Sequence, residues 1–202
     1  YGLTRGALKL VDRHGFGISV ATKSVLITRD IDLLQEIRNH SPVLAKMTIT
    51  TCDDSLSRKI EPYAPPSSER FAALRELSGQ GIFAGILLMP VLPFLEDTLE
   101  NIRGITDLAH KSGARFIYPL FGVTLRQNQR DWFYDKLDRL FPALRQKYVK
   151  EFGNAYRCSS PREKELRGVF QKECERLGML YRMEDIVSAY KRGYGYRQIS
   201  LF

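Results

Sequence analysis

The sequence predicts an α/β fold built on a parallel sheet, and two observations lead to it. Four short runs rich in apolar and β-branched residues occur before residue 123, and segments with the apolar spacing of a helix separate them. The connections between these elements are short, which favours parallel strands joined by right-handed crossovers. Both an open doubly wound sheet and part of a (β/α) barrel satisfy this order.

Each element of this α/β part is expected from local signals. Gly15 ends the first helix, Asp30 is expected to cap the second, and Pro42 cannot continue it. A serine is expected to cap the third helix, after a polar loop over residues 52–66. The third strand is almost continuously apolar, as expected for a strand covered on both faces. The expected strands cover residues 16–24, 43–51, 82–93 and 114–122, and the expected helices cover residues 4–15, 31–40, 67–81 and 98–112.

The alternation stops at Arg126, and mainly helices follow. Residues 126–152 are expected to form a long helix that Pro142 kinks or divides. Further helices are expected over residues 159–178 and 184–193. The predicted organisation is an α/β part over residues 1–125, a basic helical extension over residues 126–197 and a tail over residues 198–202.

Positive charge is concentrated in the second half of the chain. Residues 1–100 hold 11 Lys and Arg against 12 Asp and Glu, whereas residues 101–202 hold 20 against 11. Such a surface favours a polyanion such as nucleic acid, and a basic surface that only keeps the protein soluble explains the charge equally well. No run approaches about 18 apolar residues, so no membrane span is expected. The three widely spaced cysteines fit the reducing cytoplasm, and each is expected to be an ordinary buried thiol and not a metal ligand.

Polar residues follow the predicted strands, at the edge where parallel α/β proteins bind ligands. Lys23 follows the first strand, Thr48 and Thr50 lie at the end of the second, and Met89 and Pro90 at the end of the third. A lysine at this edge can pair with a carboxylate or a phosphate, while hydroxyls of the next strand complete the hydrogen bonding. The pattern suits a small anionic or zwitterionic ligand, with an ordinary surface lysine as the alternative.

A loop with three prolines, residues 58–67, follows the second strand. Prolines restrict its backbone, so Glu61 is expected to be held in place, either in a site or in an ion pair with the adjacent helix. His14, His40 and His110 fall near helix ends, where a cation is favoured whatever the function. The sequence contains no G-x-G-x-x-G after a strand, P-loop, H-E-x-x-H or G-x-S-x-G, so self-contained hydrolytic or nucleotide-kinase chemistry is not indicated.

Several segments together resemble a known family. They are ATKS at residues 21–24, MTITT at 47–51, IEPYAPPSSERFAALRELSGQGI at 60–82 and GARFIYPLFGVTLRQNQR at 113–130. Over nearly its whole length the chain resembles the radical S-adenosylmethionine proteins of the spore photoproduct lyase-like group, often called DNA repair photolyases. The E-P-x-A-P loop and the segment F-G-V-T-L-R-x-N-Q-R are the most specific parts.

The resemblance implies a partial, TIM-like (β/α)6 barrel to which residues 1–125 contribute the C-terminal part. It also implies an enzyme that uses S-adenosylmethionine and a [4Fe–4S] cluster to generate a 5′-deoxyadenosyl radical, which the lyase directs at a thymine crosslink in DNA. Lys23 and Thr48 match the lyase residues that contact S-adenosylmethionine. Further candidates for this cofactor pocket are Thr50, Glu61, Met89 and Pro90.

One departure from the family limits what this chain is expected to do. The family binds its cluster through C-x-x-x-C-x-x-C, and the sequence contains no such spacing. We therefore expect a chain that lacks the first two βα units, and that neither holds the cluster nor catalyses. The intact protein is expected to do both.

The last residues carry a separate expectation. Gln198, Ile199, Leu201 and Phe202 resemble the Q-L-x-L-F peptide with which bacterial repair and replication proteins bind the sliding clamp. Terminal apolar residues can anchor a peptide in a partner's pocket, or they can fold back onto the core of their own chain.

Arg126 and Arg130, in the basic half, are the candidate contacts to DNA. Two other classes of function stay open. One is a non-catalytic module that binds nucleic acid or the sliding clamp, and the other is an α/β enzyme that binds a phosphorylated metabolite through Lys23.

Overall fold

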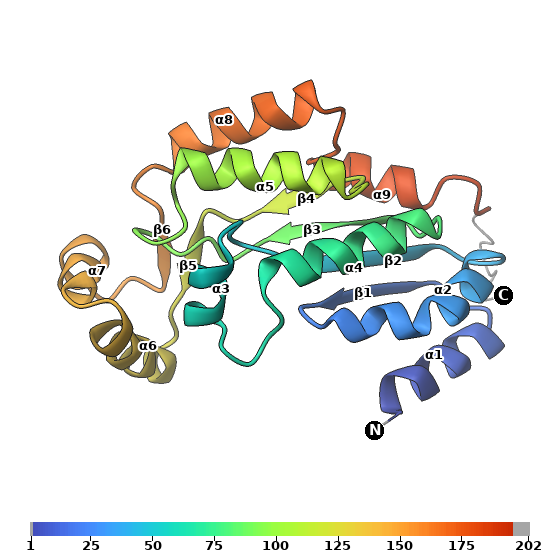
Figure 1. Ribbon diagram of the computed structural model, residues 1–202, viewed down its shortest axis with the longest axis horizontal. Coiled ribbons are helices and arrows are strands. Elements are labelled where there is room, and N and C mark those ends of the chain that lie inside the picture. Colours follow the sequence, from blue (N-terminus) through green and yellow to red (C-terminus); the bar gives the residue numbers. More distant parts are fainter. Residues whose placement is uncertain (1, 196–202) are drawn as a thin grey trace, which may run out of the picture.

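A four-stranded parallel sheet forms the central layer of the computed structural model, which describes residues 2–195 (Figure 1). The strands lie in chain order and every neighbouring pair is parallel. This confirms the predicted α/β class. The strands are β1 (Ile18–Thr22), β2 (Val43–Thr48), β3 (Ala84–Leu88) and β4 (Ile117–Pro119).

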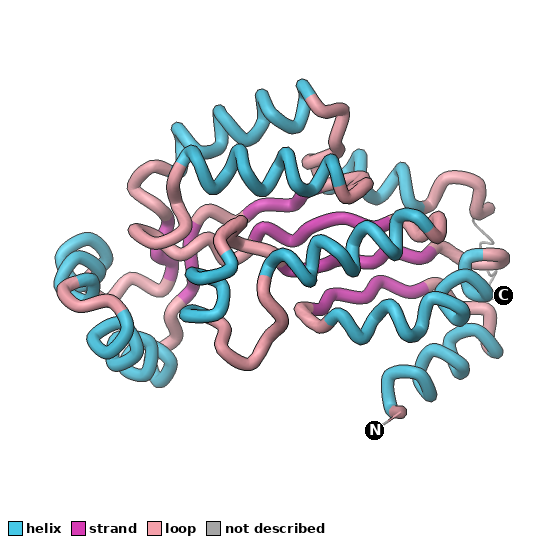
Figure 2. Tube along the Cα trace, in the orientation of Figure 1, coloured by secondary structure: helices cyan, strands magenta, loops and turns pink. Residues whose placement is uncertain are grey.

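Helices cover one face of the sheet, as Figure 2 shows. They are α2 (Ile31–Arg38), α4 (Ser67–Gly79) and α5 (Leu99–Lys111), with α1 (Leu3–Arg13) against α2 and α8 (Glu163–Arg176) against α5. Alternate residues of a strand point to one face, and in β2 these are Val43, Ala45 and Met47, all buried in the main hydrophobic core. Packing in this core fixes the position of each strand, and with it the edge of the sheet at which the strand ends.

The opposite face of the sheet is covered only toward the amino ends of the strands. There α9 (Met183–Tyr190) packs Ile186 into a small cluster with Leu44 and Phe116. Gly85 makes this packing possible, because a Cβ on it would lie 2.4 Å from the Phe116 ring. Nearer the carboxyl ends, Thr48 of the same face is only half-buried. This face is therefore open where the predicted site lies.

The segment after β4 forms a second small core beyond the carboxyl ends of the strands. In this segment β5 (Gly122–Thr124) pairs antiparallel with β6 (Arg157–Ser159). The two helices α6 (Gln127–Leu140) and α7 (Leu144–Phe152) lie between these strands in the chain. The break between the two helices confirms the expected division at Pro142. Tyr148 is fully buried, and its hydroxyl donates a 2.9 Å hydrogen bond to the carbonyl of Pro93 after β3. Residues 127–159 thus contact the edge at which the strands end. By contrast, α8 packs against α5 and α9 packs against the opposite face of the sheet.

Some local expectations were wrong. The polar loop contains α3 (Asp54–Ile60), which Asp53 caps by accepting hydrogen bonds from Ser55 and Leu56. A 3₁₀ helix, η1 (Val25–Asp30), precedes α2. Asp30 makes no capping bond, because it lies 3.1 Å from Arg5 in an ion pair that joins η1 to α1.

The start of α4 also differs from the expectation, because Pro66 occupies the capping position and no serine side chain caps the helix. The proposed clamp-binding residues Gln198, Ile199, Leu201 and Phe202 lie outside the described residues. Within residues 2–195, no helix is both long enough and apolar enough to cross a membrane.

Candidate functional site

The carboxyl edge of the sheet brings the sequence-predicted residues of the first two strands together. Thr22 and Met47 are register partners in β1 and β2, so Lys23 and Thr48, which follow them, lie at the same edge on adjacent strands. Met89 and Pro90 directly follow β3 and are half-buried. The order of the sheet thus places all four residues along one edge.

Glu61 joins Lys23 to a second cation. Its Oε1 lies 2.7 Å from Lys23 Nζ, and its Oε2 lies 2.6 Å from Arg70 Nη2. The angle of the contact to Arg70 is not that of a hydrogen bond, so this contact is electrostatic. The Lys23 side chain is 43% exposed and the Glu61 side chain 18%. The edge therefore presents an accessible ammonium beside a carboxylate.

Arg70 is the buried anchor of this arrangement, with 1% of its surface exposed. Its Nε donates to the Pro65 carbonyl at 2.6 Å, and its Nη1 donates to the Thr48 carbonyl at 3.0 Å. One guanidinium thus holds the end of β2, the proline loop and Glu61 together. Because two backbone carbonyls fix the guanidinium, its contact with Glu61 gives the carboxylate beside Lys23 a fixed position.

A second carboxyl group, Glu96, is buried below the same edge with 1% exposed surface. It accepts hydrogen bonds from the Thr50 hydroxyl at 2.5 Å and from the Leu92 amide at 2.8 Å. Burial raises the pKa of Glu96 to about 7, an effect that these hydrogen bonds oppose. The nearby charge of Glu61 raises this pKa further, and that of Lys23 lowers it. The Thr50 hydroxyl therefore donates its hydrogen bond to Glu96 and has no second proton to donate to a ligand.

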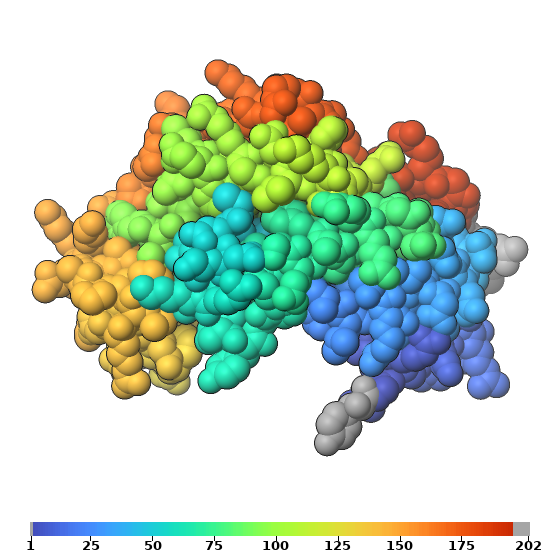
Figure 3. Space-filling view, viewed as in Figure 1, coloured from blue at the N-terminus to red at the C-terminus, as the bar shows by residue number. Residues whose placement is uncertain are grey.

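An apolar cleft with a basic rim opens beside Lys23 and Glu61. Its volume is about 680 Å³, and its walls come from the segment around α3 and from α6. In Figure 3 these two segments adjoin, and the Lys59 ammonium lies 4.3 Å from the centre of the Phe141 ring. Two aromatic side chains of the cleft are exposed, Tyr63 completely and Trp132 by 63%. The cations on the rim are Arg58, Lys59, Lys136 and Arg139.

The two arginines predicted to contact DNA have different surroundings. Arg126 is exposed at the start of α6. Arg130 donates to the carbonyls of Gly153 at 2.9 Å and Ala155 at 2.6 Å, and so ties α6 to the loop before β6. Nucleic-acid contact stays a prediction for both residues, and Arg130 also has a structural role.

The described residues do not fit an iron–sulfur cluster. Within residues 2–195, no group of three His, Cys, Asp or Glu is placed to hold a metal ion. Cys52, Cys158 and Cys174 are free thiols; Cys158 and Cys174 are buried and Cys52 is half-buried. Burial raises the pKa of all three and takes that of Cys174 to about 12, which disfavours the thiolates that a cluster requires.

Arg70, Glu96 and Trp132 were missed by the sequence reasoning. Arg70 has a detectable signal, because it shares the helical spacing of Ala73, Leu74 and Leu77, the buried stripe of α4. A charged residue on such a stripe implies a buried partner. Glu96 and Trp132 have no comparable local signal.

Sequence comparisons find relatives of undetermined function. No family model matches the sequence. An uncharacterized protein of Mycobacterium tuberculosis is 29% identical over 148 residues, covering 73% of this chain and 43% of that protein. An uncharacterized protein of Methanocaldococcus jannaschii is 35% identical over 106 residues, covering 52% of this chain and 39% of that protein. The chain thus spans less than half the length of these curated relatives.

The parallel sheet and its covering helices define a partial (β/α) barrel whose candidate site lies at the carboxyl ends of its strands. A solved structure of a spore photoproduct lyase mutant, with bound S-adenosylmethionine and dinucleoside spore photoproduct, shares this architecture. It matches with a TM-score of 0.57 and 15% identity, over 87% of this chain and 54% of the lyase. The likeness shows the fold, a partial TIM-like (β/α) barrel.

Proposed function

We propose that this chain is part of a radical S-adenosylmethionine enzyme of the spore photoproduct lyase-like group, and that its strand edge receives the amino-acid end of S-adenosylmethionine. The observation that carries the proposal is the pairing of Lys23 with Glu61 at 2.7 Å at an accessible edge. The methionine end of the cofactor carries one carboxylate and one ammonium. A fixed carboxylate beside an exposed ammonium is complementary to both charges.

The individual residues have separate tasks in this proposal. Lys23 has three N–H donors, so it can bind the ligand carboxylate while it stays near Glu61. Glu61 receives the ligand ammonium and is held by Arg70, and Thr48 borders the pocket from the next strand. The bound cofactor would supply the adenosyl group for radical chemistry. Lyase activity, and the cluster that such chemistry requires, are proposed only for a longer protein, because the described residues do not fit a cluster.

Lys23→Met should weaken the binding of S-adenosylmethionine by about tenfold or more, because an ion pair to the ligand carboxylate is lost. Equilibrium dialysis with labelled S-adenosylmethionine measures this in the longest form of the protein that can be purified. Lys9→Met, on the exposed face of α1, is the matched control and should bind normally. Equal affinity of the two variants would refute the assignment of Lys23.

Competition separates this proposal from a site for a phosphorylated metabolite. Free methionine should displace S-adenosylmethionine, because it carries the same two charges. Inorganic phosphate should not displace it, because phosphate has no ammonium to pair with Glu61 and its negative charge is repelled by the Glu61 carboxylate. The reverse pattern would favour the phosphorylated metabolite.

The aromatic cleft beside the site favours nucleic acid as the substrate class. Exposed Trp132 and Tyr63 offer faces on which bases can stack, and the cations of the rim can contact phosphates. The cleft adjoins Lys23, so a base held there would lie next to the proposed cofactor site. A module that only binds nucleic acid would use the same cleft.

Trp132 is the one tryptophan in the sequence, so its emission reports directly on the cleft. A single-stranded oligonucleotide should quench it, and the affinity should fall as salt rises. Trp132→Ala should weaken binding about tenfold, measured by the anisotropy of a labelled oligonucleotide. Phe16→Ala, which removes an exposed ring before β1, is the control. Unquenched emission on binding would place the nucleic acid elsewhere.

A further inference from the structure

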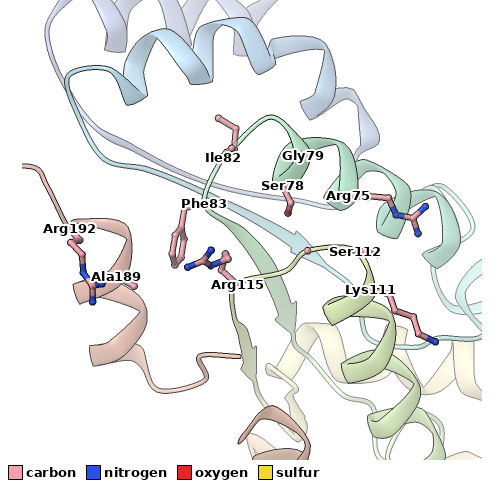
Figure 4. A pocket seen from close by; sticks show the side chains of 12 residues that line it. Arg75, Ser78, Gly79, Ile82, Phe83, Lys111, Ser112, Arg115, Ala189 and Arg192 are labelled. Carbon is pink, nitrogen blue, oxygen red and sulfur yellow. The ribbon is translucent and has the colours of Figure 1, made fainter. Parts of the chain in front are cut away.

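A second pocket lies at the amino-terminal edge of the sheet, opposite the Lys23 site. Its volume is about 640 Å³, and it is formed by the carboxyl ends of α4, α5 and α9 and by the loops that lead into β3 and β4. Figure 4 shows Arg115 near its centre, beside the Phe83 ring, with Arg75 and Lys111 on one side and Arg192 on the other. Among residues 2–195, no carboxylate lines this pocket.

The four cations of this pocket are exposed, and none has an acidic partner among residues 2–195. Arg75 and Lys111 lie in or near the last turns of α4 and α5, where the helix dipole favours a cation without any ligand. Arg192 directly follows the C-terminus of α9, where the same effect applies, whereas Arg115 lies in the loop between α5 and β4 and has no such explanation. The Arg115 guanidinium lies 5.9 Å from the Phe83 ring centre, and its N–H edge can still donate.

Two serine hydroxyls in this pocket add an independent observation. Ser78 Oγ and Ser112 Oγ are buried, and neither has a hydrogen-bond partner in the part of the chain that the structure describes. Ser112 is 1% exposed, and Figure 4 shows the Ser78 side chain pointing from α4 toward the loop that holds Ser112. A buried hydroxyl without a partner costs free energy, so a ligand that accepts its hydrogen bond is stabilised there.

We propose that this pocket, built around Arg115, Arg192, Ser78 and Ser112, binds a phosphate group. Phosphate offers oxygens that accept from hydroxyl and guanidinium donors, and its charge matches the unpaired cations. The site is separate from the strand-edge site and does not depend on the function proposed for Lys23. The phosphate belongs either to a small phosphorylated molecule or to the backbone of a nucleic acid.

Isothermal titration calorimetry of the full chain with inorganic pyrophosphate tests the pocket directly. The double variant Arg115→Gln/Arg192→Gln should weaken pyrophosphate binding by about tenfold or more. Arg13→Gln/Arg103→Gln removes the same charge from exposed positions outside the pocket, and should change the affinity by no more than about twofold. Equal losses in the two double variants, or no pyrophosphate binding by the wild type, would overturn the proposal.

Ser112→Ala gives a second readout that does not depend on removing charge. Without ligand this variant should be as stable as the wild type or slightly more stable, because an unsatisfied buried hydroxyl is lost. Its affinity for pyrophosphate should nevertheless fall several-fold. Unchanged affinity would show that the ligand is not held by this hydroxyl, and the site as proposed would be wrong.

An abasic oligonucleotide distinguishes the two sources of phosphate, because it has a backbone but no base for the aromatic cleft. Tighter binding than pyrophosphate, lost in the Arg115→Gln/Arg192→Gln variant, would identify a nucleic-acid backbone. Pyrophosphate binding without oligonucleotide binding would identify a small phosphorylated ligand. Both results support a phosphate site at this edge.

Discussion

Arg70→Met should lower the free energy of unfolding by about 3–5 kcal/mol, the usual cost of removing one partner from a buried ion pair. The substitution leaves the carbonyls of Thr48 and Pro65 without their donor, and leaves Glu61 with Lys23 as its remaining cation. Urea unfolding followed by circular dichroism measures the change. The variant should also bind S-adenosylmethionine more weakly, because Glu61 is no longer fixed.

Arg75→Met is the matched control, with the same substitution on the same helix at an exposed residue that forms no ion pair within residues 2–195. Its free energy of unfolding should stay within about 0.5 kcal/mol of the wild type when no phosphate is present. A loss below about 1 kcal/mol for Arg70→Met would contradict the buried network, because the broken bonds alone exceed that value.

Glu96→Gln should stabilise the protein relative to the wild type as pH rises, by about 3 kcal/mol at pH 8. In the folded protein the pKa of Glu96 is about 7, above its ordinary value of 4.5, so the folded state binds a proton more tightly than the unfolded state. The stabilisation that this proton provides is complete below pH 4.5 and is lost as pH rises through about 7. Glutamine cannot ionise, so its contribution does not change over this range.

Unfolding free energies of both proteins at several pH values between 5 and 8 test this prediction. The amide can still accept from the Leu92 amide and can donate to Thr50, so the two proteins should be similarly stable near pH 5. Glu100→Gln, an exposed carboxylate on α5, is the control and should show the pH dependence of the wild type. A difference between wild type and Glu96→Gln that stays constant from pH 5 to pH 8 would show that Glu96 does not titrate in this range.

Much of the fold and part of the site follow from local sequence patterns. The four strands, the helices between them and the division at Pro142 were predicted, because apolar spacing and proline act over a few residues. The short helix α3 was missed because its sequence is polar: Leu56 and Ile60 are its apolar residues, and the residue that it buries is Ser57. Asp30 was misassigned because its partner, Arg5, lies 25 residues earlier in the chain.

The sequence by itself determined that Lys23 and Thr48 lie at the ends of neighbouring parallel strands and that Glu61 lies in the proline loop after the second, since a parallel sheet collects its carboxyl ends at one edge. Only the tertiary structure decided how these residues are paired and which other groups join them. Arg70 meets the carbonyl of Thr48 across 22 positions of the chain, and Thr50 meets Glu96 across 46. Such contacts depend on how strands and helices pack. A charge or hydroxyl that is buried by packing must find its partner in space, and the residues next to it in the chain do not reveal which one it is.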